Sequence, residues 1–194
     1  RYRLEKGTLL LDTFSVPKLS PEAVGEVATE GLRLGAYSFD QYKTVREEPK
    51  KELKEVTLLV EHQNPLPVEK GLKAAAVVTD SVIRVRDLIS GPSSDITPSK
   101  LASVAKEIGR KTGIKVTVLE KAAIQRLGMG GLLGVSKASH EGPRFIIMEY
   151  NLTRKNHPLF VFVGKGITFD TGGISIKPAK DMDRMKYDMS GAAA

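Results

Sequence analysis

The stretch from Phe145 to Val163, FIIMEYNLTRKNHPLFVFV, decides how the second half of this chain folds. It contains two nearly continuous apolar runs, Phe145–Tyr150 and Leu159–Val163. Such runs are typical of strands that are covered on both faces by helices. We therefore expect two central strands of a sheet in this stretch.

Helices and strands alternate upstream of these two runs. The expected elements are a helix capped by Thr97 with Pro98 at its first position, a strand at Ile114–Leu119, a short helix at Ala122–Leu127 and a glycine-rich loop at Gly128–Gly134. This alternation predicts an α/β fold with a mostly parallel sheet.

The first half of the chain predicts a second, smaller α/β arrangement. Its expected elements are a strand at Leu9–Phe14, a helix at Pro21–Gly35 capped by Ser20, a charged loop at Arg46–Lys54, a strand at Glu55–Glu61, a break at Asn64–Pro67 and a long helix from Val68 to about Ile89. We expect a first α/β domain at 1–65, a linker helix at 66–90 and a second α/β domain at 91–194.

Composition excludes some classes of function. The 194 residues carry a net charge of +7 but no cysteine, so thiolate chemistry and disulfides are excluded. The basic residues are spread along the chain without interleaved aromatic residues, which favours a solvated surface over a nucleic-acid site. No apolar run approaches the roughly 20 residues that cross a bilayer, and no signal peptide is evident.

Familiar catalytic motifs are also excluded. The loop LGMGGLLG has Leu133 where a dinucleotide-binding loop needs its third glycine. Gly164-Lys165 is not a phosphate loop, because Leu159 and Gly166 stand at positions that need glycine and Ser or Thr. No Gly-x-Ser-x-Gly elbow occurs. The three histidines, His62, His140 and His157, lack metal-ligand spacing and are expected on the surface.

The segment that follows the second apolar run, Val163–Ala194, is richer in chemistry: VGKGITFDTGGISIKPAKDMDRMKYDMSGAAA. It begins at the carboxyl end of the expected strand, which is where ligand sites form in open α/β sheets. Asp170 and Asp188 are suitable oxygen ligands for Mg, Mn or Zn. The alternative interpretation is a loop with two surface ion pairs between lysine and aspartate. Generic chemistry leaves both interpretations open.

This segment strongly resembles the core of the leucyl (cytosol) aminopeptidases, a family of two-metal exopeptidases. The resemblance extends upstream to VRDLISGPSSDITPSKLA, to LGMGGLLGVSKASHEGPRFIIMEY and, in the N-terminal half, to EGLRLGAYSFDQYKT. It covers most of the chain. The resemblance implies that 1–65 is a partial N-terminal α/β domain and that 91–194 is an incomplete catalytic α/β domain. Ser190 and Tyr187 stand where the family often has glycine and alanine.

The resemblance implies a role for five residues, all in Val163–Ala194. It implies that Lys165 ligates a metal through its amine, that Asp170 bridges two metals and that Asp188 ligates the more tightly held one. Lys177 would stabilise the oxyanion as a catalytic, substrate-binding group, and Met185 would line the pocket for the first side chain of the substrate. A lysine amine can ligate only without its proton, and two nearby cations favour that form.

The implied protein is a metal-dependent aminopeptidase that releases leucine-like N-terminal residues from peptides. Its cofactors would be two divalent ions, Zn or Mn, with Mg or Co as further options. We expect peptide substrates, a homohexamer, a cytoplasmic location, and neither membrane nor nucleic-acid partners. A DNA-binding architectural role and a non-catalytic homologue are the alternatives.

A larger departure from the family concerns the metal ligands. The resemblance places the remaining metal ligands, and an arginine that holds bicarbonate, in an Asp-x-Glu-x-Arg motif, which this sequence does not contain. We expect the chain to be an internal fragment of a protein more than twice as long, and to be inactive by itself.

Overall fold

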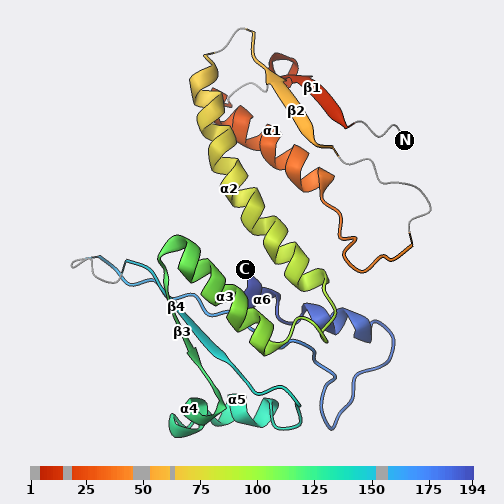
Figure 1. Ribbon diagram of the computed structural model, residues 1–194, viewed down its shortest axis with the longest axis vertical. Coiled ribbons are helices and arrows are strands. Elements are labelled where there is room, and N and C mark those ends of the chain that lie inside the picture. Colours follow the sequence, from red (N-terminus) through yellow and green to blue (C-terminus); the bar gives the residue numbers. More distant parts are fainter. Residues whose placement is uncertain (1–4, 15–18, 46–52, 62–63, 152–156) are drawn as a thin grey trace. The chain divides into compact units, whose positions relative to one another are not determined.

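The computed structural model describes residues 5–14, 19–45, 53–61, 64–151 and 157–194. The chain divides into two compact units, Arg1–Asp87 and Leu88–Ala194. Helices and strands occur in both units, so the predicted α/β class is confirmed (Figure 1). The assignment of 66–90 as a linker helix between two domains stays a prediction.

The first unit combines a pair of strands with two helices. Its elements are β1 (Lys6–Leu10), a 3-10 turn η1 (Leu11–Phe14), α1 (Pro21–Ala36), β2 (Glu55–Leu59) and most of α2 (Pro65–Ser90). Strand β1 pairs with β2 in parallel. The buried side chains of Leu11, Val24 and Val68 form its core.

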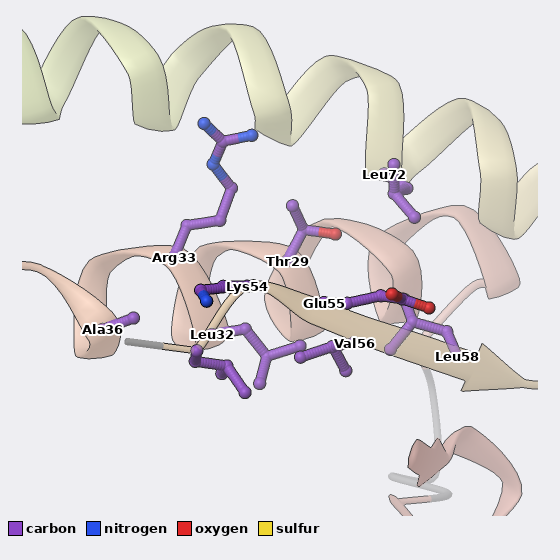
Figure 2. Close-up of a pocket in the computed structure, with 10 residues that line it drawn as sticks. Thr29, Leu32, Arg33, Ala36, Lys54, Glu55, Val56, Leu58 and Leu72 are labelled. Atoms are coloured by element: carbon purple, nitrogen blue, oxygen red, sulfur yellow. The ribbon is translucent and has the colours of Figure 1, made fainter. Parts of the chain in front are cut away.

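Two glycines allow α1 and α2 to touch. A Cβ added at Gly25 would lie 2.2 Å from the carbonyl oxygen of Val68, and one at Gly71 would lie 2.0 Å from that of Glu22. No real Cβ tolerates such distances, so a side chain at either position would force the helix backbones apart. The same unit holds a shallow pocket of about 230 Å³. Leu32 of α1 and Val56 of β2 are among the residues that line it (Figure 2).

Local signals placed α1 and the start of α3 (Pro98–Thr112) correctly. Ser20 Oγ accepts a hydrogen bond from the Ala23 amide at 3.2 Å, and Thr97 Oγ1 accepts one from the Lys100 amide at 3.2 Å. In each helix the residue after the cap is proline, whose missing N–H costs nothing at that position.

Two predictions in the first unit need correction. The strand predicted at Leu9–Phe14 ends at Leu10, because the chain turns there and Asp12 accepts a hydrogen bond from the Glu61 amide at 2.6 Å. The break predicted at Asn64–Pro67 is the start of α2, since the Asn64 side chain accepts from the Leu66 amide at 3.1 Å. Most of the predicted loop Arg46–Lys54 and His62 lie outside the described residues.

The second unit holds the remaining elements. They are α3, β3 (Lys115–Leu119), α4 (Lys121–Arg126), α5 (Gly130–Val135), β4 (Phe145–Glu149), a 3-10 helix η2 (Met182–Tyr187) and α6 (Ser190–Ala193). Helix α3 packs against both strands. The core consists of Leu88, Ile96, Leu101 and Met189.

The strand pairing of the second unit differs from the prediction. Strands β3 and β4 pair antiparallel, with Lys115 opposite Glu149 and Leu119 opposite Phe145. Within the described residues the apolar run Leu159–Val163 joins no strand, and its side chains are exposed. The alternation of strand and helix reports neither strand direction nor the identity of a partner, so it could not exclude this pairing.

The glycine-rich loop predicted at Gly128–Gly134 is also wrong in part. Gly128 has φ +65° and ends the turn after α4, but a new helix, α5, begins at Gly130. His140 and His157 are exposed, as predicted. No helix in the described part of the chain has the length and apolar character needed to span a membrane.

Candidate metal centre

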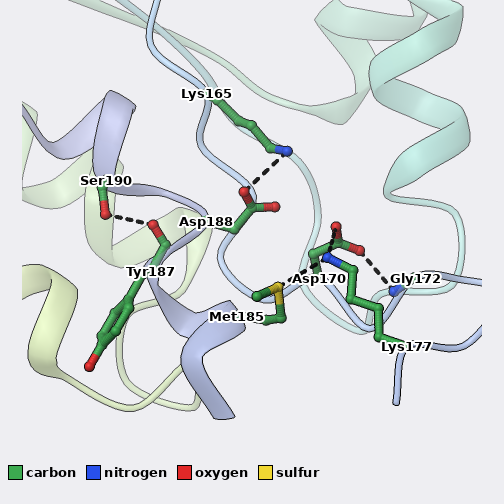
Figure 3. A network of polar contacts seen from close by, with 8 residues as sticks. All are labelled: Lys165, Asp170, Gly172, Lys177, Met185, Tyr187, Asp188 and Ser190. Carbon is green, nitrogen blue, oxygen red and sulfur yellow. Dashed lines mark hydrogen bonds and ion pairs between the residues drawn. The ribbon is translucent and has the colours of Figure 1, made fainter. Parts of the chain in front are cut away.

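The segment 163–194 brings the five implicated side chains into one region of the second unit (Figure 3). Lys165, Asp170 and Lys177 come from irregular chain, Met185 lies in η2, and Asp188 directly follows η2. They form two lysine–aspartate pairs: Lys165 with Asp188, and Lys177 with Asp170.

Two glycines set the approach of Lys165 to Asp188. A Cβ added at Gly164 would lie 2.2 Å from the carbonyl oxygen of Gly191, so the backbones touch there. The Ala192 amide donates to the Lys165 carbonyl at 2.9 Å. Close backbone contact is possible only without side chains. The start of α6 is thereby held against the chain that carries Lys165.

The Lys165–Asp188 pair is incomplete. Lys165 Nζ lies 3.1 Å from Asp188 Oδ1, and the Asp188 side chain is 21% exposed. Its second oxygen, Oδ2, is buried and accepts no hydrogen bond in the structure. A buried carboxylate oxygen without a partner costs free energy unless a donor or a cation supplies one. Such an orphaned oxygen fits a position that a divalent cation would occupy.

The Lys177–Asp170 pair is complete by comparison. Lys177 Nζ donates to Asp170 Oδ2 at 2.8 Å, and the Gly172 amide donates to Oδ1 at 2.8 Å. Gly172 has φ +94° and Gly173 has φ +75°, a conformation that favours glycine and turns the chain back toward Asp170. The Lys177 amide closes this turn on the Thr171 carbonyl at 2.9 Å.

These contacts also set the charge state of Asp170. The hydrogen bond from the Lys177 ammonium, followed by that from the Gly172 amide, holds the pKa of the Asp170 carboxyl below its ordinary value. The positive charge of Lys165 acts in the same direction. Asp170 is therefore an anion at neutral pH, as a metal ligand must be.

Met185 lies next to the ammonium of Lys177. Its Sδ is 3.0 Å from Lys177 Nζ. The resemblance implies that Met185 and Lys177 contact the same substrate, and their side chains point toward one another in Figure 3. Whether they contact a substrate stays a prediction.

The donor set in this chain is small. In the described ranges, no three His, Cys, Asp or Glu side chains gather where they could hold a metal ion. The resemblance implicates Lys165, Asp170 and Asp188 as ligands, and their metal-binding role stays a prediction. Sequence reasoning missed the supporting residues Gly164, Gly191 and Met189. The two glycines give only a weak signal in the sequence. Gly164 is a small residue that follows the apolar run Leu159–Val163, and Gly191 is a small residue near the start of α6.

Curated proteins similar to this chain are named as cytosol aminopeptidases. A chain from Geotalea uraniireducens named as a probable cytosol aminopeptidase is 47% identical over 167 residues, which cover 85% of this chain and 34% of the relative. The cytosol aminopeptidase of Pseudomonas aeruginosa is 41% identical over 187 residues, covering 96% of this chain and 38% of the relative. The chain thus spans little more than a third of these curated relatives.

Solved structures give the same result. The bottromycin maturation enzyme BotP in complex with Mn aligns over 98% of this chain and 38% of its own, with a TM-score of 0.77 and 31% identity. A cytosol aminopeptidase from Coxiella burnetii aligns over 88% and 34%, with a TM-score of 0.72 and 27% identity. The profile of the cytosol aminopeptidase catalytic domain matches residues 83–194, more than half of the chain. The chain therefore belongs to the cytosol aminopeptidase family.

Proposed function

We propose that this chain supplies part of the active site of a metal-dependent aminopeptidase, which releases N-terminal, leucine-like residues from peptides. One observation of the structure carries the metal assignment: the buried Oδ2 of Asp188 has no hydrogen-bond partner among the described residues, and the other oxygen of this carboxylate pairs with the Lys165 amine. Family membership supports the reaction class, and a similar structure was solved in complex with Mn. We propose two divalent ions, Zn or Mn, as cofactors, with Mg and Co as further options.

The side chains present fit such ions. Asp188 would offer its free oxygen, Asp170 would offer a carboxylate whose pKa is already low, and Lys165 would ligate as the neutral amine. When bound, the ions supply Lewis acidity and an activated water for attack on the peptide carbonyl.

Lys177 would act on the substrate. Its ammonium sits on Asp170 and Met185 Sδ, at 2.8 Å and 3.0 Å, on a side chain that is 35% exposed. A fixed cation aimed at the carbonyl oxygen stabilises the negative charge that develops there during attack. Met185 beside it would contact the first side chain of the peptide, which favours apolar residues at that position.

The remaining proposals concern the parent protein, which we expect to be longer than this chain. They are a homohexamer, a cytoplasmic location and the supply of further ligands from an Asp-x-Glu-x-Arg motif. The chain alone is expected to be inactive, so turnover of a leucyl amide by the 194 residues with Mn or Zn, at the rate of an intact family member, would contradict this account.

The test of the function uses Lys177→Ala in the parent protein. We expect kcat on leucyl substrates to fall about a hundredfold to a thousandfold, while metal content measured by elemental analysis stays the same. Lys180→Ala removes an exposed lysine of the same loop and should leave both unchanged. Loss of metal from Lys177→Ala would show that Lys177 holds the ions rather than the oxyanion.

A further inference from the structure

Lys186 makes a contact that none of the roles above uses. It lies in η2, two residues before Asp188, and its Nζ donates to the Ser90 carbonyl at 3.0 Å. The contact is partly buried and joins residues 96 apart in the chain. Ser90 is the last residue of α2. Terminal carbonyls of a helix lack partners within the helix and carry partial negative charge, so an ammonium there satisfies both needs.

A second anchor lies on the other side of Asp188. The Met189 side chain is fully buried in the core with Leu88, Ile96 and Leu101. The Asp188 amide donates to the Met185 carbonyl at 3.3 Å, which fixes the turn between the two anchors. Lys186 Nζ also lies 5.3 Å from the centre of the Tyr187 ring, which restricts it further. Asp188 is therefore held on both sides by neighbours with fixed partners.

We propose that Lys186 is a positioning residue for Asp188, which keeps its free oxygen buried and available to a divalent cation. This inference rests on the proposed metal role of Asp188. Without the hydrogen bond to Ser90, the end of η2 can turn, and the Asp188 carboxylate can leave its buried position and be hydrated. An oxygen that water already satisfies gains less from a cation, so metal affinity falls.

The charge of Lys186 makes the proposal testable, because the loss of that charge alone predicts the opposite change in metal affinity. Removing a positive charge near a cation site reduces repulsion and should tighten metal binding. Loss of the Lys186–Ser90 hydrogen bond should weaken metal binding. A fall in affinity on neutralising Lys186 therefore cannot come from its charge.

The experiment titrates the metal-free parent protein with Mn²⁺ and follows free Mn²⁺ by electron paramagnetic resonance. We expect Lys186→Met to weaken Mn²⁺ binding about tenfold or more, the usual cost of losing a group that orients a ligand. Lys186→Arg keeps a donor for Ser90 and should restore most of the affinity. Lys180→Met removes the same charge from an exposed position and should leave the affinity unchanged or slightly tighter.

Two results would overturn the proposal, and they are distinguishable. If Asp188→Asn binds Mn²⁺ as the unaltered parent protein does, or neither binds it, the metal role of Asp188 fails and the positioning role of Lys186 fails with it. If Asp188→Asn weakens binding but Lys186→Met does not, only the positioning role of Lys186 fails. Circular dichroism checks that each variant is folded. Should Lys186→Met unfold, Lys186→Gln takes its place with the same expectation.

Discussion

The two lysine–aspartate pairs of the candidate centre have the same composition but differ in completeness. In the Lys177–Asp170 pair both carboxylate oxygens accept a hydrogen bond at 2.8 Å. In the Lys165–Asp188 pair one oxygen meets an ammonium at 3.1 Å and the other is buried without a partner. The first pair satisfies itself within one loop. The second has a place for a further positive charge.

This difference separates two explanations of the segment 163–194. Ordinary surface ion pairs contribute about 0–1 kcal/mol, and the large majority of buried polar side-chain atoms in proteins have a hydrogen-bond partner. A metal carboxylate is expected to look incomplete when no ion is considered, because part of its coordination lies outside the chain. Lys177–Asp170 alone fits either explanation, whereas Lys165–Asp188 favours the second.

The largest expected effect comes from separating the incomplete pair. Gly164→Ala places a Cβ 2.2 Å from the Gly191 carbonyl oxygen, so the start of α6 must move away from Lys165. We expect the second unit to lose about 1–3 kcal/mol of unfolding free energy, with the Lys177–Asp170 pair unaffected. Urea unfolding followed by amide NMR signals of this unit measures the loss.

The matched control is Gly131→Ala in α5. A Cβ there meets nothing within 4 Å, and alanine favours a helix more than glycine does. This variant should be neutral or slightly stabilising. Equal destabilisation by the two substitutions would mean that the Gly164–Gly191 contact does not hold the pair together.

A smaller effect distinguishes the two aspartates directly. Without metal, Asp170→Asn removes a satisfied charge and should destabilise the chain slightly. Asp188→Asn removes the charge that burial leaves unsatisfied, so it should cost less than Asp170→Asn or raise the stability. Thermal unfolding in the presence of a chelator compares them. The reverse order would contradict the assignment of Asp188 as the incomplete partner.

The smallest effect is in the titration of Asp170. Its pKa is lowered, first by the Lys177 hydrogen bond and then by the Gly172 amide. The stabilisation is therefore present above the pKa of an unfolded aspartate and is lost as pH falls through the lower, folded pKa. Carboxyl ¹³C NMR of the metal-free chain should show a midpoint below that of aspartate in an unfolded peptide. Lys177→Met should raise it, and an unchanged midpoint would argue against the contact.

How much of this could be predicted depends on the range of each interaction. Caps and first-turn prolines act within a few residues, so Ser20 with Pro21 and Thr97 with Pro98 located the starts of two helices. Strand direction depends on partners far along the chain. That is why the antiparallel pairing of β3 with β4 was missed.

The candidate site shows the same difference between local and long-range interactions. The identities of Lys165, Asp170, Lys177 and Asp188 were predicted because they lie in one continuous motif. The contact of Gly164 with Gly191 and the bond of Lys186 to Ser90 were not, because they join segments 27 and 96 residues apart in sequence. Nothing local in the chain marks either of them.

The most direct test of the central claim is Mn²⁺ titration of the ¹⁵N-labelled chain observed by NMR. A metal bound at Lys165, Asp170 and Asp188 is predicted to broaden the amides of 164–166, 170–172 and 188–192 first, and Asp188→Asn should abolish this pattern. Broadening that begins elsewhere, or that persists unchanged in Asp188→Asn, would contradict the account.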